Sequence, residues 1–109
     1  MNQIDTSKKN IDLISKHGMV EFKKDVWKTS NSESRGKMLK SLFRQESFVG
    51  SRNENVFNLL GLSTCYIDYE DQPCYEIIFD EKYYFLVFYV YHSTDKAGTI
   101  SNIRFFERD

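Results

Sequence analysis

The carboxylates near residue 70 are the first side chains that could do chemistry. Asp68, Glu70 and Asp71 lie close together, and paired carboxyl groups can carry out general acid–base catalysis. Such catalysis needs a cleft that shifts one of the pKa values, and a turn between two strands offers none. The sequence also has no nucleophile with a recognisable histidine base and no glycine-rich nucleotide motif. We therefore expect no enzyme and no cofactor.

Two cysteines and two histidines are the remaining candidates. A hairpin turning at residues 69–70 would place Cys65 opposite Cys74, so a disulfide is geometrically conceivable. We expect reduced thiols instead, because the first thirty residues contain no apolar run typical of an export signal. For the same reason we expect a cytoplasmic protein without a membrane partner. His17 and His92 lack ligand-like neighbours, which predicts no metal site.

A change in apolar periodicity after Gly61 predicts the elements that position these residues. Apolar residues recur at helical spacing over 11–61, with a break at Gly18, whereas 1–10 are polar and expected to be ragged. Alternation over 62–109 predicts strands at 63–69, 74–80, 83–92 and 99–107, joined by gaps short enough for hairpins. We therefore predict a single α+β domain over 1–109, with N-terminal helices packed on one face of a four-stranded antiparallel meander sheet.

Two S-x-x-E patterns predict where helices begin. Ser30 with Glu33 fits a capping box for a helix over about 32–46. Ser51 with Glu54 fits a second box, for a short helix that Gly61 ends.

The two halves of the chain carry opposite charge. Residues 1–60 contain 11 Lys and Arg against 7 Asp and Glu, whereas residues 61–109 contain 4 against 9. The acidic half also holds 12 of the 17 aromatic residues. Nucleic-acid binding is not expected, because aromatic side chains that stack on bases need basic neighbours.

The strand predicted at 83–92 has no polar side. Leu86, Phe88 and Val90 suit the helix-packed core. The side left facing away from the helices presents Tyr83, Phe85, Val87, Tyr89 and Tyr91. Tyrosine is common at interfaces because it combines a large contact area with few rotatable bonds. This face predicts partner binding, self-association, or coverage by the N-terminal segment.

An acidic run borders the same face. Six acids and no base lie between residues 66 and 81: Asp68, Glu70, Asp71, Glu76, Asp80 and Glu81. Such a run is either a solvated edge that deters aggregation or a surface that attracts a basic partner.

One stretch of the chain resembles a known family. Val26-Trp27-Lys28, Arg35-Gly36-Lys37-Met38 and the phrase Gly50-Ser51-x-x-Glu54-x-Val56-x-x-Leu59-Leu60-Gly61 are similar to small domains of the BamE/SmpA (outer-membrane assembly lipoprotein) and beta-lactamase-inhibitor-protein type. The resemblance covers about residues 26–62. It implies a helix–helix–sheet domain whose open sheet face binds other proteins. Leaderless members are similar to immunity proteins, including those of contact-dependent growth-inhibition systems, which neutralise a co-encoded toxin.

The resemblance and the acidic, tyrosine-rich face together favour a bacterial immunity protein that occludes a basic nuclease toxin. The expected partner-binding residues are Tyr66, Asp68, Tyr69, Glu70, Asp71, Glu76, Phe85, Tyr89 and Tyr91. Phe85, Tyr89 and Tyr91 would anchor the toxin, and the acids would mimic the phosphates of its substrate. The alternative is a BamE-like assembly scaffold, or a homodimer formed through the same face.

Overall fold

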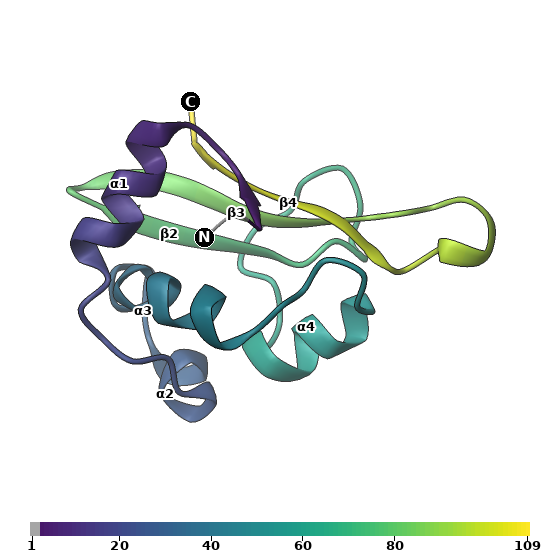
Figure 1. Cartoon of the computed structure of the whole chain (residues 1–109), viewed down its shortest axis with the longest axis horizontal. Coiled ribbons are helices and arrows are strands. Elements are labelled where there is room, and N and C mark those ends of the chain that lie inside the picture. The colour runs from purple at the N-terminus through teal and green to yellow at the C-terminus, as the bar shows by residue number, and fades with distance from the viewer. Residues whose placement is uncertain (1–2) are drawn as a thin grey trace.

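A sheet and a layer of helices pack together in the computed structural model, which describes residues 3–109 (Figure 1). The helices are α1 (Lys8–His17), α2 (Lys24–Thr29), α3 (Ser32–Gln45) and α4 (Asn53–Leu60). The strands are β1 (Ile4–Asp5), β2 (Cys74–Phe79), β3 (Lys82–Val90) and β4 (Ile100–Glu107), and a 3-10 helix, η1 (Thr94–Lys96), lies between β3 and β4. The predicted α+β class is confirmed.

The sheet is mixed, so the prediction of a purely antiparallel meander is wrong. Its order is β1-β4-β3-β2, and only β2, β3 and β4 form antiparallel pairs. β1 lies parallel to β4, with Ile4 opposite Ile103. Residues 3–10 are therefore ordered rather than ragged, because Ile4 is buried in the core and the Gln3 side chain donates to the carbonyls of Phe43 and Glu46. Met1 and Asn2 lie outside the described residues.

Residues 63–69 do not form the predicted strand. Side-chain hydroxyl groups, rather than backbone carbonyls, accept hydrogen bonds from β2 here. Ser63 Oγ accepts from the Cys74 N–H at 3.0 Å, and Thr64 Oγ1 accepts from the Glu76 N–H at 2.8 Å. Asp68 then adopts a left-handed φ of 63°, which ends any extended run. Short hydroxyl side chains compete with backbone pairing in this way, and alternation alone does not reveal it.

The helices lie near the predicted ranges, but both capping boxes are wrong. Asn31, not Ser30, caps α3 by accepting from the Ser34 N–H at 2.9 Å. Arg52 is the N-cap residue of α4 and pairs with Glu54, whereas the Ser51 hydroxyl donates back to the Phe48 carbonyl. The predicted break at Gly18 is confirmed, since α1 ends at His17.

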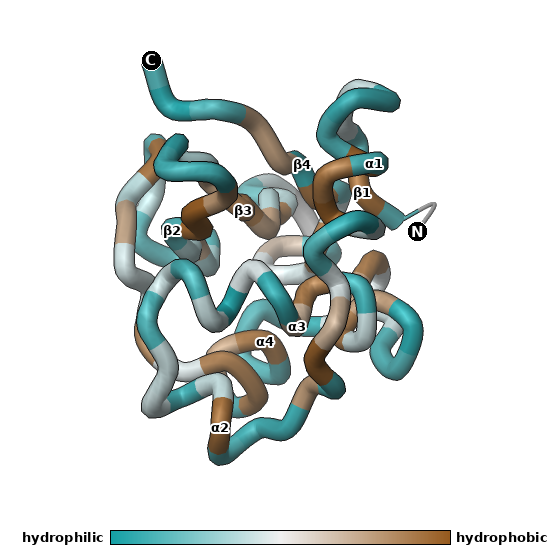
Figure 2. The backbone as a smooth tube through the Cα atoms, turned by 90° about the vertical axis from the view of Figure 1, so that its left-hand side faces the viewer, coloured by the Kyte–Doolittle hydropathy of each residue, from teal (hydrophilic) through white to brown (hydrophobic). Residues whose placement is uncertain are grey.

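Close packing of α3 on β2 sets the distance between the layers. A Cβ on Gly36 would lie 2.6 Å from the Phe79 ring, so only glycine fits at this contact. Trp27 is fully buried and donates from Nε1 to the Leu60 carbonyl at 2.9 Å, which ties α2 to the end of α4. Figure 2 shows the hydrophobic stretches of strands and helices on either side of this core.

Candidate protein-binding face

β3 divides the core from the open face, which is the side of the sheet away from the helices. Leu86, Phe88 and Val90 are buried in the core, as predicted, and Tyr84 is buried with them. Alternation directs the other side chains of β3 to the open face, together with their partners on β2 and β4. On the strands, the open face thus comprises Cys74, Glu76, Ile78, Tyr83, Phe85, Val87, Tyr89, Asn102, Arg104 and Phe106.

Val87 and Cys74 are the exceptions among these residues, because both are fully buried. The neighbours of Val87 across the sheet are Cys74 and Arg104. Cys74 forms a disulfide with Cys65, whose Cα lies 5.3 Å away, so the prediction of reduced thiols is wrong. The Cys65 and Thr64 N–H groups both point to the Cys74 carbonyl, which brings the two cysteines together without a paired strand.

The disulfide closes a segment that rises beside the sheet and carries five of the predicted binding residues (Figure 1). We call residues 66–71 the tip. Tyr66 and Tyr69 are 61% and 55% exposed, and Asp68 and Glu70 are exposed beside them. Large aromatic side chains with this exposure are available to a partner.

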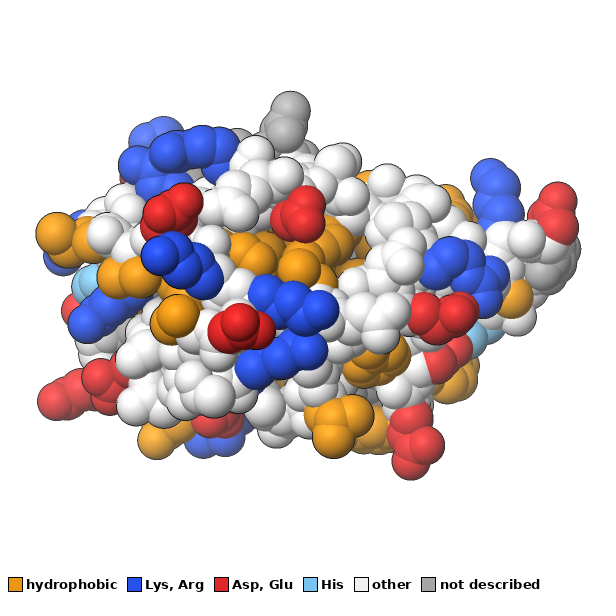
Figure 3. Space-filling view, turned by 90° about the horizontal axis from the view of Figure 1, so that it is seen from below, with side chains coloured by type: hydrophobic (Ala, Val, Ile, Leu, Met, Phe, Trp, Pro, Cys, Tyr) orange, Lys and Arg blue, Asp and Glu red, His pale blue; other side chains and the backbone are white. Residues whose placement is uncertain are grey.

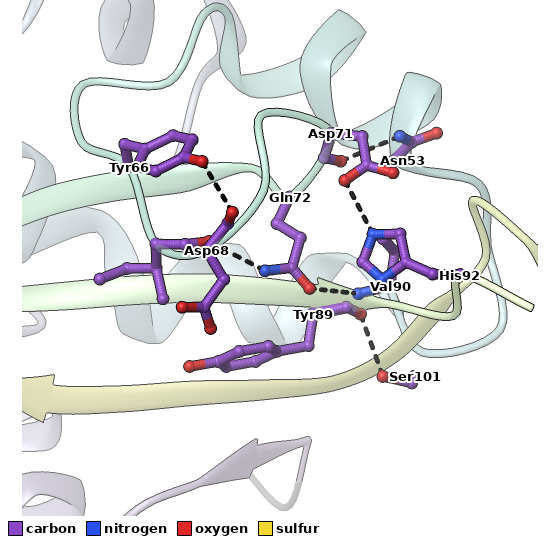
Figure 4. Close-up of polar contacts among 10 residues, drawn as sticks. Asn53, Tyr66, Asp68, Asp71, Gln72, Tyr89, Val90, His92 and Ser101 are labelled. Carbon is purple, nitrogen blue, oxygen red and sulfur yellow. Dashed lines mark hydrogen bonds and ion pairs between the residues drawn. The ribbon is translucent and has the colours of Figure 1, made fainter.

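Gln72 anchors the tip to the sheet. Its side chain is buried, accepts from the Val90 N–H at 3.2 Å and donates to the Ile67 carbonyl at 3.0 Å (Figure 4). Asn53 of α4 donates to the Asp71 carbonyl at 2.9 Å, so the helical layer also holds the tip. Within the tip, the Tyr66 hydroxyl donates to the Asp68 carbonyl at 2.7 Å.

His92 belongs to the site, although no binding role was predicted for it. Its Nε2 lies 3.0 Å from Asp71 Oδ1, and its ring packs against Tyr69 with centroids 4.2 Å apart. Tyr91 is 42% exposed, with Lys96 Nζ 5.5 Å from the centre of its ring, and forms no hydrogen bond to the tip within the described residues. The segment that follows β3 therefore contacts the tip through His92.

Two arginines on the open face were also missed. Arg108 lies over the Tyr83 ring at 4.4 Å and pairs with Glu76 at 3.4 Å. Arg104 lies 5.6 Å from the Phe106 ring, which packs edge-on against Phe85 at 5.8 Å. The alternation of side chains along residues 102–108 could have predicted this, because it places both arginines on the same side of the strand as Phe106.

The acidic run is not one surface. Asp80 and Glu81 form the β2–β3 turn, about 17 Å of strand away from the tip. Glu76 is paired with Arg108, and Asp71 contacts His92. Among the described residues, Asp68 and Glu70 form no ion pair. Of the acids on the tip, Asp68 and Glu70 are therefore the ones free to meet a partner.

The groups whose pKa values are shifted by the fold are buried residues, not residues exposed on the open face. Burial raises the pKa of Tyr75, whose hydroxyl donates to the Gly61 carbonyl at 2.7 Å. Burial also raises the pKa of Tyr84, with smaller contributions from Glu107 and Asp80. Burial lowers the pKa of Arg35, which donates from Nε to the Trp27 carbonyl.

The rest of the surface offers less specific features. Seen from the helical side, hydrophobic side chains lie in a central hollow among mixed charges (Figure 3). A hollow of about 300 Å³ is lined mainly by polar side chains around Phe48 and Leu59. Within residues 3–109, no group of three or more His, Cys, Asp or Glu could hold a metal ion. None of the helices in this range is long and apolar enough to cross a membrane.

These features define a two-layer α+β domain with an aromatic open face and a disulfide-closed tip. No protein-family model, curated protein or solved structure gives a significant match to the chain. The resemblance to BamE-like domains and immunity proteins therefore stays a prediction.

Proposed function

We propose that this domain binds another protein through the tip and the adjoining open face, and that the partner is a co-encoded toxin domain with a basic surface. The observation that carries the proposal is the composition of the tip. Tyr66 and Tyr69 are exposed beside Asp68 and Glu70, which have no ion-pair partner in the described chain. Such a combination suits a basic partner, because aromatic rings supply contact area and free carboxylates supply attraction.

The tip also has the rigidity that protein recognition favours. A disulfide closes it, and Gln72 and Asn53 bind its carbonyl groups. A pre-ordered segment loses little conformational entropy on binding, so more of the contact energy is available as affinity. Phe85 and Tyr89 are half-buried on the neighbouring strand and would extend the contact.

Neutralisation would follow from occlusion. Nucleases need a basic surface to bind phosphate groups. Carboxylates of the tip would occupy that surface while the tyrosines exclude the substrate. Asp68 and Glu70 take the leading part in this proposal, since Asp71 and Glu76 already have partners within the chain.

The test uses the protein encoded immediately upstream of this chain as the probe. It is expressed from a controlled promoter in bacteria whose cytoplasm permits disulfide bonds, with and without this chain, and growth is measured. Rescue of growth and a stable complex of the two purified proteins are expected. Failure of this chain to rescue growth from a toxic upstream product, or an upstream product that is harmless, would contradict the proposal.

Two variants locate the contact. The double variant Asp68→Lys/Glu70→Lys reverses the free charges of the tip and should slow association at least tenfold at low salt, because steering by charge is lost. The matched control Asp12→Lys/Glu21→Lys reverses two exposed acids on the helical side and should leave the rate within twofold. Equal association rates for the two double variants would show that the tip is not the contact surface.

The disulfide changes the proposed place of action. Such bonds persist in oxidising compartments and are reduced in the cytoplasm. We therefore propose that the domain acts in an oxidising compartment, rather than in the cytoplasm expected from the sequence. Alkylating free thiols in intact cells before lysis tests this: unmodified cysteines support it, and two modified cysteines per chain contradict it.

A further inference from the structure

The Cys65–Cys74 bond encloses the free acids and exposed tyrosines of the tip. We propose that this bond is a redox switch, in which the oxidised form presents the tip for binding and reduction by a thiol releases it. This inference rests on the proposed function of the tip and adds its regulation. It begins from the unequal burial of the two cysteines: Cys74 is fully buried, whereas Cys65 is only half-buried.

The difference in burial between the two cysteines determines which sulfur a reductant can attack. A reductant thiolate attacks the accessible sulfur of Cys65, the S–S bond breaks, and Cys74 leaves as a thiolate that takes up a proton. A second reductant thiol then attacks the mixed disulfide and frees Cys65 as a thiol. In sum, the protein disulfide gains two electrons and two protons, and two reductant thiols become one disulfide. Reoxidation by a disulfide of the same class reverses the reaction.

The hydrogen bonds of the segment divide it into a fixed base and a tip that depends on closure. At the base, Thr64 and Gln72 bond to β2 and β3 through the Cys74 carbonyl and the Val90 N–H. Neither bond needs the disulfide. Within the tip, the bond from Tyr66 to Asp68 and the bond from the Tyr69 N–H to the Ile67 carbonyl join its own residues. Bonds from outside reach Ile67, Tyr69 and Asp71, through Gln72, Asn53 and His92, so the part that relies on closure is the one around Tyr66 and Asp68.

Asp68 adds to this dependence. Its φ of 63° lies in the left-handed region, which costs free energy for residues with a Cβ, although less for Asp and Asn than for most others. Closure of the segment holds Asp68 in that conformation. After reduction, the base stays on the sheet, and we expect the tip to leave this single conformation and so to lose the pre-ordering that favours binding.

Hydrogen exchange tests the switch without a partner. The amides of Tyr69 and Gln72, which donate to carbonyls of the tip, are measured in the oxidised protein, in the protein reduced with dithiothreitol, and in the Cys65→Ser/Cys74→Ser variant. Protection in the tip should fall at least tenfold on reduction, while amides of β3 and β4 keep their protection. Unchanged protection in the tip would overturn the inference. General loss of protection in the reduced wild-type protein would also overturn it, because the bond would then support the whole fold.

Affinity for the upstream-encoded protein separates this inference from the proposed function. Oxidised protein should bind at least tenfold more tightly than reduced protein, and reoxidation should restore the affinity. Equal affinity of both forms overturns the switch but leaves the proposed function standing. If neither form binds, the proposed function is overturned. A change in hydrogen exchange on reduction would then have no role in regulating binding.

Discussion

The side chain of Gln72 accepts a hydrogen bond from the backbone N–H of Val90 at 3.2 Å. A loop side chain thereby satisfies a buried backbone donor at the end of β3, and its amide nitrogen holds the Ile67 carbonyl at the same time. One residue therefore couples the last position of the strand to the base of the tip. Buried polar side chains of this kind are tolerated because all their hydrogen-bonding groups have partners.

Removing this link should destabilise the domain. Gln72→Ala leaves the Val90 N–H and the Ile67 carbonyl without their partner, and an unsatisfied buried group costs about 1–3 kcal/mol. We expect the free energy of unfolding, measured in urea, to fall by about 2 kcal/mol. The control Gln45→Ala removes an exposed glutamine that also forms hydrogen bonds, and it should change stability by less than about 0.5 kcal/mol. Equal losses in both variants would show that Gln72 has no special role.

Gly36 should be irreplaceable at the contact of α3 with β2. The Cβ of Gly36→Ala would lie 2.6 Å from Phe79 and 3.1 Å from Ile77, both in the core. Overpacking costs about 1–3 kcal/mol, against a gain of about 1 kcal/mol in helix propensity. A net loss of stability is expected in thermal and urea unfolding, whereas Lys37→Ala, at the next and exposed position, should be nearly neutral. A more stable Gly36→Ala variant would contradict the packing argument.

Local periodicity explains what the sequence could predict. The core side of β3 follows from alternation, and α3 follows from its apolar stripe, because both patterns depend on residues close in sequence. β1 could not be predicted in this way, since Ile4 and Asp5 are too few to show a period. Their pairing with β4 depends on Gln3 reaching two carbonyls at the end of α3 and just beyond it.

The candidate site shows the same limit. The tyrosines and acids of the tip were found from composition, but which acids have partners depends on contacts between distant residues. Arg108 meets Glu76 across 32 positions, and His92 meets Asp71 across 21. The disulfide was conceivable from spacing, but the choice between thiol and disulfide relied on an expected cellular compartment, which is not a geometric constraint.

Reduction of the disulfide should destabilise the domain without unfolding it. Cross-linking the ten residues from Cys65 to Cys74 restricts the unfolded chain, and the chain-entropy relation gives about 2–3 kcal/mol for a loop of this length. We expect urea unfolding of the oxidised and dithiothreitol-reduced protein to differ by this amount, with β-sheet circular dichroism retained before the transition. A difference below about 0.5 kcal/mol would mean that the segment is equally restricted without the bond.

Tyr75 should make stability depend on alkaline pH. Its raised pKa means that the folded state keeps the hydroxyl protonated after the unfolded chain has begun to ionise near pH 10. Above that pH the unfolded state binds fewer protons than the folded state, so stability falls as pH rises, by up to about 1.4 kcal/mol per pH unit for one group. Below pH 10 this contribution is constant. Urea unfolding between pH 7 and pH 11 measures the slope.

The variant Tyr75→Phe isolates this effect. At pH 7 it loses the hydrogen bond from the hydroxyl to the Gly61 carbonyl and should be less stable by about 1 kcal/mol. Above pH 10 it should lose stability more slowly than the wild type, so the two stability curves converge. Tyr84 has a raised pKa as well, so the slope of the variant should be reduced rather than abolished. Parallel curves for Tyr75→Phe and the wild type would show that ionisation of Tyr75 does not limit alkaline stability.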